Sequence, residues 1–152
     1  MDKPERRRFV SVLAGLAAMP LLPVRSSRAQ PDPFGELVRT LTSGAPVTPG
    51  RVAIDTPRLA DNGHSVPLKI SVESPMTAAD HVRSITLLSG RNPRPLMATF
   101  QLGPRSGRAV VATRVRLNGT QRVLAIAQLS DGSYWSGSAD VEVTESACLD
   151  MS

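Results

Sequence analysis

The residue best suited to covalent chemistry is Cys148, the single cysteine in a sequence of 152 residues. It is the fifth residue from the C-terminal end, in the segment Glu145–Ser152. Chain ends are usually exposed and poorly ordered, so a thiol at this position does not suit a role in core packing. We therefore predict that the preceding domain presents Cys148 for reaction with another molecule.

The sequence does not indicate an enzyme or a metal site. A nucleophilic thiol needs a base and an orienting group held rigidly beside it, and a terminal segment is a poor place to fix that geometry. His64 and His81 are the only histidines, and no Cys/His cluster accompanies them. We interpret both as surface residues, and Met76 and Met97 as core or partner-facing residues, and we expect no metal or cofactor.

A signal peptide is predicted for residues 1–29, with cleavage after Ala29. Its basic segment precedes an apolar run over 10–22 that is too short to span a bilayer. A twin-arginine signal, which exports proteins from the bacterial cytoplasm, is indicated by Arg6, Arg7 and Phe9. An arginine-rich signal of the ordinary secretory type is the alternative. Either way we expect an exported protein without a transmembrane helix.

The basic character of the sequence belongs largely to this leader. Residues 1–29 hold six of the 18 Lys and Arg and two of the 13 Asp and Glu, which leaves 12 basic and 11 acidic residues. A net charge of +1 on residues 30–152 gives no basic footprint for nucleic acid or an anionic membrane. One cysteine also excludes an internal disulfide.

The start of the remaining chain has the pattern of a short helix over residues 32–41. Asp32 is a suitable N-cap and Pro33 suits the first helical position. Helical spacing places four apolar residues on one face, namely Phe34, Leu37, Val38 and Leu41. So short a helix must dock on the domain, and we expect it to cover the open end of a β core.

From residue 50 onward the sequence predicts about seven short strands separated by turn residues. They are expected at 51–55, 66–72, 82–89, 96–102, 108–117, 122–129 and 134–144. Asn118-Gly119 is the strongest hairpin signal in the chain. The pattern is typical of an all-β, Ig-like antiparallel β-sandwich over residues 30–144, followed by a flexible arm over 145–152.

Several stretches resemble the SoxY family, the sulfur carriers of bacterial thiosulfate oxidation. They follow the family's order and span nearly the whole exported chain: Leu59–Leu68, Val72–Thr77, Asn92–Pro95, Thr113–Leu117 and Leu129–Ser133. The resemblance implies an Ig-like sandwich, a periplasmic location and a heterodimer with a SoxZ-type subunit. It further implies a swinging C-terminal arm on which Cys148 holds a sulfur intermediate, while separate enzymes load, oxidise and release it. A SoxZ-type subunit without its own signal could be exported by the leader of this chain.

The arm departs from the usual SoxY pattern, in which two glycines stand on each side of the cysteine. Its flanking residues here are Ser146, Ala147, Leu149 and Asp150. Their Cβ atoms restrict the backbone, and Glu145 and Asp150 add negative charge that opposes thiolate formation. The arm is more similar to that of a SoxY-related variant ending in Ala-Ala-Cys-Ile-Glu.

Two hypotheses from different classes remain. In the first, Cys148 forms a covalent adduct with a sulfur species and carries it between enzymes. In the second, the sandwich is a binding or assembly module, and Cys148 makes only an intermolecular disulfide or holds another cargo. We favour the carrier. A free thiol at a chain end is costly to keep in an oxidising compartment, because it is readily oxidised, and a use for the thiol explains why it is present.

Overall fold

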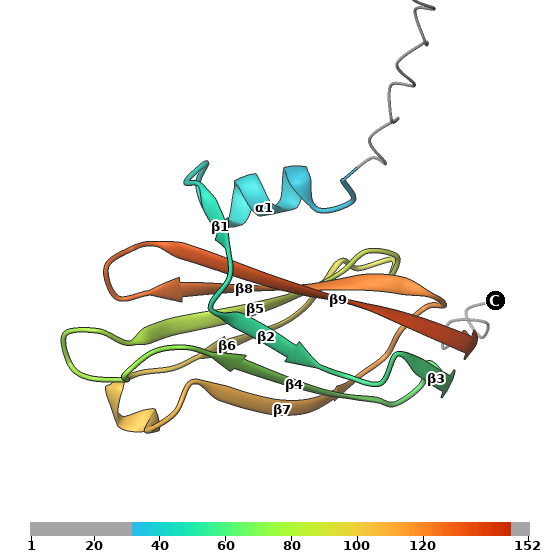
Figure 1. The fold of residues 1–152 in the computed structure, drawn as a ribbon. Helices are drawn as coiled ribbons and strands as arrows, with labels where there is room; N and C mark the ends of the chain where they lie inside the picture. Colours follow the sequence, from blue (N-terminus) through green and yellow to red (C-terminus); the bar gives the residue numbers. More distant parts are fainter. Residues whose placement is uncertain (1–31, 147–152) are drawn as a thin grey trace, which may run out of the picture. The chain divides into compact units, whose positions relative to one another are not determined.

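Two β-sheets stack face to face in the computed structural model, which describes residues 32–146. The larger sheet has the strand order β1-β9-β8-β5-β6, with β3 also paired to β9, and the smaller has the order β2-β4-β7 (Figure 1). One α-helix, α1 (Gly35–Leu41), and one 3-10 turn, η1 (Pro104–Ser106), complete the described elements. The strands are β1 (Val47–Pro49), β2 (Val52–Asp55), β3 (Leu59–Asn62), β4 (Val66–Val72), β5 (Val82–Ser89), β6 (Leu96–Gln101), β7 (Val110–Val115), β8 (Gln121–Leu129) and β9 (Tyr134–Glu145).

The predicted all-β sandwich is confirmed, and all seven predicted strands are present. Two further strands, β1 and β3, were not expected, and both pair with β9 in parallel rather than antiparallel fashion. β1 has three residues and β3 has four, and neither has more than one buried residue, so no alternating pattern marks them. Both form because β9 offers them a distant backbone partner, which no local sequence signal reveals.

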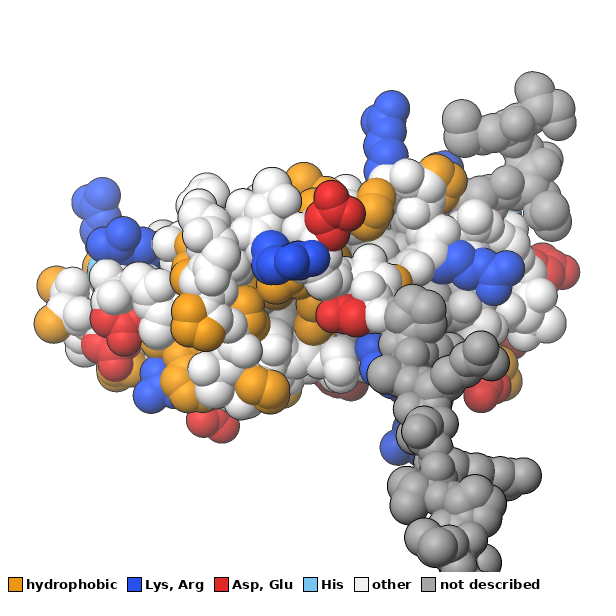
Figure 2. Space-filling view, turned by 90° about the horizontal axis from the view of Figure 1, so that it is seen from above, with side chains coloured by type: hydrophobic (Ala, Val, Ile, Leu, Met, Phe, Trp, Pro, Cys, Tyr) orange, Lys and Arg blue, Asp and Glu red, His pale blue; other side chains and the backbone are white. Residues whose placement is uncertain are grey.

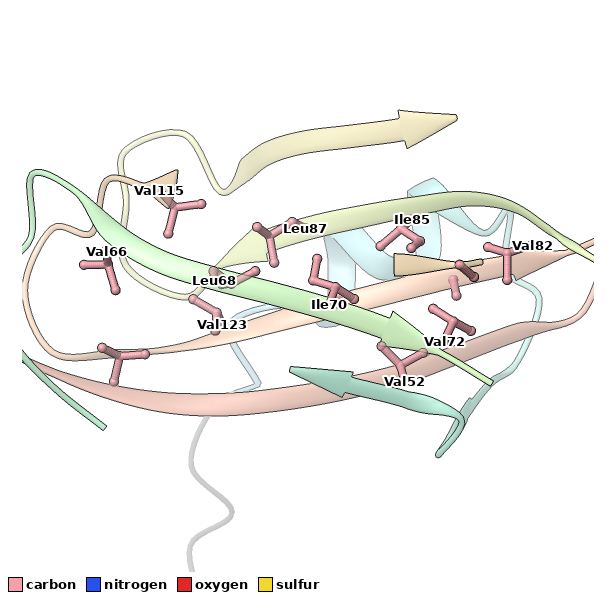
Figure 3. Packing of buried hydrophobic residues seen from close by; sticks show 14 of the residues in the cluster. Val52, Val66, Leu68, Ile70, Val72, Val82, Ile85, Leu87, Val115 and Val123 are labelled. Carbon is pink, nitrogen blue, oxygen red and sulfur yellow. The ribbon is translucent and has the colours of Figure 1, made fainter. Parts of the chain in front are cut away.

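The main core lies between the sheets and follows the alternation of the sequence. β4 buries every second residue, with Val66, Leu68, Ile70 and Val72 pointing inward. Figure 3 shows these side chains packed with those of Val82, Ile85 and Leu87 from β5 and Val123 from β8. Burying apolar surface in this way supplies the main stabilisation of the fold.

The helix α1 covers the outer face of the larger sheet, not the open end of the core. Phe34 is buried against Leu88 and Ile126, and Leu37, Val38 and Leu41 pack on the same cluster. The helix begins one residue after Phe34, and Asp32 accepts a hydrogen bond from the Phe34 backbone in the preceding turn (3.0 Å) instead of capping the helix. This docking explains why β5 buries Leu87 on one face and Leu88 on the other.

Figure 2 looks down on this outer face, where hydrophobic side chains gather in the region of α1 and charged side chains stand singly around them. Within residues 32–146, no helix has the length and apolar character needed to cross a membrane.

β9 is the most heavily paired strand of the sandwich. It bonds β8 along one edge, and along the other it bonds β1 at Tyr134–Ser136 and β3 at Glu142–Glu145. Between these two segments β2 approaches so closely that a Cβ atom on Gly137 would lie 2.0 Å from the carbonyl oxygen of Val52. Only glycine allows that approach, so Gly137 determines how the smaller sheet closes over β9.

Gly137→Ala should therefore destabilise the domain by about 1–3 kcal/mol, because either β2 or β9 has to shift to admit the methyl group. The measurement is equilibrium urea denaturation followed by the fluorescence of Trp135, the one tryptophan. Gly103→Ala is the matched control, since its backbone is extended and its Cβ would meet no atom within 4 Å. Equal unfolding free energies for the two variants would contradict the proposed role of Gly137.

Candidate functional site

The candidate site is the base of the C-terminal segment, where Glu145 and Ser146 are described. Glu145 is the last residue of β9, so the predicted arm begins within the final strand. The other predicted site residues, Cys148, Ala147, Leu149 and Asp150, lie outside the described part of the chain, as do the signal-peptide residues Arg6, Arg7, Phe9 and Ala29.

The end of β9 is held from two sides. On one side Glu145 pairs with Asn62 of β3, and its carbonyl oxygen accepts a hydrogen bond from the Gly63 backbone (2.7 Å). On the other side the backbone of Val143 donates to Oγ1 of Thr120 (3.0 Å). The last residues of β9, Val143–Glu145, are therefore held in place on both sides.

Asn118-Gly119 does not form the predicted hairpin. β7 pairs with β4 in the smaller sheet, whereas β8 pairs with β5 and β9 in the larger one. The residues from Arg116 to Thr120 thus cross from one sheet to the other, and Gly119 takes a positive φ of 81° to make that turn. The dipeptide correctly indicated a tight turn, but long-range pairing decided which strands it connects.

A polar network fastens this crossing to the end of β5. Oδ1 of Asn92 accepts hydrogen bonds from the backbone of Asn118 (2.9 Å) and from Nε2 of Gln121 (3.1 Å). Nδ2 of Asn92 donates to the carbonyl of Arg116 (2.8 Å). The buried hydroxyl of Ser89 bonds to Gln121, so the interior side of the network is satisfied.

The same network reaches the C-terminal segment. The hydroxyl of Ser146 bonds to Oδ1 of Asn118, whose backbone is held by Asn92. Sequence reasoning identified Ser146 as a flanking residue but missed the anchoring side chains of Asn92, Asn118 and Thr120. Asn92-Pro93 and Asn118-Gly119 are visible in the sequence as turns, yet nothing local indicates that they contact each other.

Three of the five family-like stretches meet at this end of the sandwich. Gly63 bonds both Glu145 and Leu117, and Asn92 bonds the crossing that follows Thr113–Leu117. The stretches around Val72–Thr77 and Leu129–Ser133 lie at the opposite end, where the backbone of His81 donates to Oγ of Ser130 (3.1 Å).

The two histidines lie beyond opposite ends of β4. His64 precedes the first residue of β4 and is exposed, whereas His81 follows the loop after β4 and is half-buried. Seven residues of strand span roughly 20 Å, so the two imidazoles cannot act on one group. No group of three or more His, Cys, Asp or Glu is arranged to hold a metal among the residues described. Met76 is a core residue whose sulfur accepts from the Val82 backbone, and Met97 packs against the core.

Three arginines, Arg91, Arg114 and Arg116, lie in or next to the crossing from β7 to β8. The guanidinium of Arg91 lies against Gly119, 3.4 Å from where a Cβ would stand, and Arg114 donates to the hydroxyl of Ser65 (2.7 Å). Arg116 belongs to the crossing itself.

The structure defines a β-sandwich protein whose last described residues, Glu145 and Ser146, are held by hydrogen bonds to neighbouring loops. The sequence profile described as sulfur oxidation protein SoxY matches residues 38–148, most of the chain and through to the cysteine. The chain belongs to the SoxY family, whose members are sulfur carriers and not catalysts.

Solved structures agree on the fold. SoxY from Chlorobium limicola f thiosulfatophilum has a TM-score of 0.62 and 22% identity, covering 73% of this chain and 96% of its own. A superoxide reductase (neelaredoxin) from Ignicoccus hospitalis has a TM-score of 0.57 and 19% identity, covering 72% and 98%. At these identities the likeness concerns the fold alone. No curated protein matches the sequence.

Asn92→Ala should destabilise the domain by about 2 kcal/mol, because three hydrogen-bond partners lose their bonds at once. The measurement is again urea denaturation, with amide hydrogen exchange to locate the loosened region at 116–120. Asn62→Ala is the control, since its side chain accepts one exposed bond from the His64 backbone. An equally small effect from both variants would show that the network does not fix the crossing.

Proposed function

We propose that Cys148 is the covalent carrier thiol of this SoxY-family protein. The single observation that carries the proposal is the match to the family profile, which extends to Cys148, the one cysteine of the sequence. The anchoring of Ser146 to Asn118 supports it, because the sandwich then ends in a fixed base two residues before the thiol.

The proposed reaction is the oxidative joining of the thiol to a sulfur anion. With thiosulfate, the Cys148 sulfur bonds the outer sulfur, the thiol proton is released, and two electrons pass to an acceptor on a visiting enzyme. The product is a cysteine S-thiosulfonate, which further enzymes oxidise and hydrolyse to release sulfate. The carrier itself supplies position and local charge, and no catalytic group.

The short distance from base to thiol limits where the cargo can go. Two residues span at most about 7 Å, so the Cα of Cys148 stays within that distance of the Cα of Ser146. We propose that the cargo meets arginines of the crossing, chiefly Arg91 and Arg116, because the crossing also holds Ser146 through Asn118. We infer that these cations offset Glu145 and Asp150 and allow an anionic adduct despite the acidic flanks.

The flanking residues are proposed to select the visitors. Ala147 and Leu149 add bulk beside the sulfur where a glycine-flanked cysteine would have none, and they reduce the backbone freedom needed to enter a narrow cleft. We therefore assign this chain to the SoxY-related variant with a non-glycine arm, served by enzymes with wider clefts.

The proposed setting is the periplasm, reached through the twin-arginine signal of residues 1–29, in a heterodimer with a SoxZ-type subunit. Periplasmic sulfur-oxidising enzymes would visit the thiol in turn. The alternative is that the heterodimer is an assembly module and that Cys148 forms only a disulfide with another molecule.

Loading can be measured directly by intact mass. The reduced chain from residue 30, with its SoxZ-type subunit and a thiosulfate-oxidising enzyme preparation, should gain the mass of one thiosulfonate group, and Cys148→Ser should gain none. A SoxY protein with a glycine-flanked cysteine serves as the positive control. If that control is loaded and this chain is not, thiosulfate is not its cargo.

Replacing Cys148 by Ser in the producing bacterium separates the carrier from the assembly module. We expect oxidation of the sulfur source to fall to the level of a deletion strain, while the heterodimer still forms, because Cys148 is not needed for folding. Unchanged sulfur oxidation with the serine variant would favour the assembly module.

A further inference from the structure

Acidic and basic residues are strongly segregated along the chain, although the net charge of residues 30–152 is only +1. Residues 81–130, which include β5 to β8, contain eight arginines and no Asp, Glu or Lys. Among the described residues the one ion pair is Arg122 with Asp140 (2.8 Å), at the surface of the larger sheet. Three of the other arginines of this stretch, Arg94, Arg105 and Arg108, are exposed next to β6, one before it and two in the connection to β7.

β6 is an edge strand among residues 32–146, and a register shift between Leu87 and Leu88 is the one irregularity in its pairing with β5. Its sequence, Leu96–Gln101, contains no charge and no proline, and within the described chain it pairs only with β5. β7 is likewise the last strand of the smaller sheet, and η1 joins the two edges (Figure 1). Free edges invite pairing with another chain, and proteins normally blunt them with charges or prolines inside the strand.

Apolar side chains accompany the free edge. Leu96 at the start of β6 is 46% exposed and Val110 at the start of β7 is 41% exposed. They are two of the three large hydrophobic residues exposed within residues 32–146. Met97 and Phe100 on β6 are only half-buried where they pack against the core. The edge thus offers backbone bonds and apolar contacts together.

The arginines stand beside β6 rather than in it. Arg94 lies two residues before the strand, and Arg105 and Arg108 lie in the connection that follows it. In a two-fold antiparallel pair of β6 with a second copy, Arg94 of each chain would approach the arginines after β6 of the other. Like charges in such a pair repel, so the edge is unsuited to self-association.

We propose that the β6 edge binds the edge strand of a different protein, one whose strand is flanked by acidic residues. Strand addition would satisfy the free backbone groups of β6, while carboxylates would pair with Arg94 and Arg105. The β6 edge is thereby assigned as the binding surface for the SoxZ-type subunit. The identity of that subunit rests on the proposed function.

Other anionic ligands fit the edge less well. Single-stranded nucleic acids bind on exposed aromatic side chains, and among the described residues every Phe, Tyr and Trp is buried or half-buried. Binding to anionic membranes relies on clustered basic residues with aromatic anchors at the surface, and this edge has no exposed aromatic anchor within residues 32–146. A free strand bordered by Leu96 and Val110 is better matched by a protein.

The test compares two charge-reversal variants of the exported chain with equal change in net charge. R94E/R105E reverses the charge beside β6, and R39E/R58E reverses two exposed cations on α1 and on the loop before β3. Affinity for the purified SoxZ-type subunit is measured by calorimetry at low and high salt. Amide exchange of free and bound chain then locates the contact.

We expect R94E/R105E to weaken binding about ten-fold or more, R39E/R58E to change it less than about two-fold, and salt to weaken the wild type. The amides of Leu96–Gln101 should become protected on binding. Equal affinity of both variants, or protection elsewhere, overturns the β6 assignment while the heterodimer stands. Absence of any complex with the wild type overturns the partner of the proposed function as well.

Competing ligands are tested in parallel with the same two variants. Binding of a single-stranded oligothymidylate or of phosphatidylglycerol vesicles that is lost only in R94E/R105E, without an effect on the SoxZ-type subunit, overturns the protein partner. Concentration-dependent self-association of the wild type by light scattering, with protection of β6, would instead assign the edge to a second copy.

Discussion

The close crossing of β2 over β9 at Gly137 is the constraint on which the rest of the structure depends. It brings the carbonyl of Val52 to where any side chain at position 137 would stand, and so joins the two sheets along one side. β1 and β3 occupy the same edge of β9 on either side of the crossing. Because β9 is held along both edges, it delivers the chain to Ser146 in a fixed position.

That fixed position gives the C-terminal segment its character. The hydroxyl of Ser146 bonds to Asn118, and Asn92 bonds the crossing from Arg116 to Thr120. Under the proposed function, this fixed base carries the thiol two residues further on, and Ala147 and Leu149 restrict the backbone beside it more than glycines would.

The charged residues are divided between different parts of the chain. Acidic residues lie before residue 81 and after residue 130, and the arginines between them occupy the β5 to β8 region. Arg94, Arg105 and Arg108 of this stretch flank the β6 edge, where we place the partner, and Arg91 lies against Gly119 in the crossing. A net charge near zero conceals this division, because the total does not depend on where the charges lie.

The sequence by itself determined the β class and the seven predicted strands, and it singled out Cys148 as the residue on which the proposed function rests. Alternation in β4 and the turn residues between strands are local signals, and a lone cysteine is visible without a fold. Only the tertiary structure decided the place of α1, the pairing of β1 and β3, and the route through Asn118-Gly119, which joins two sheets instead of one hairpin. These features depend on contacts between residues far apart in the chain, such as Asn92 with Asn118 and Ser146 with Asn118, which no local pattern encodes.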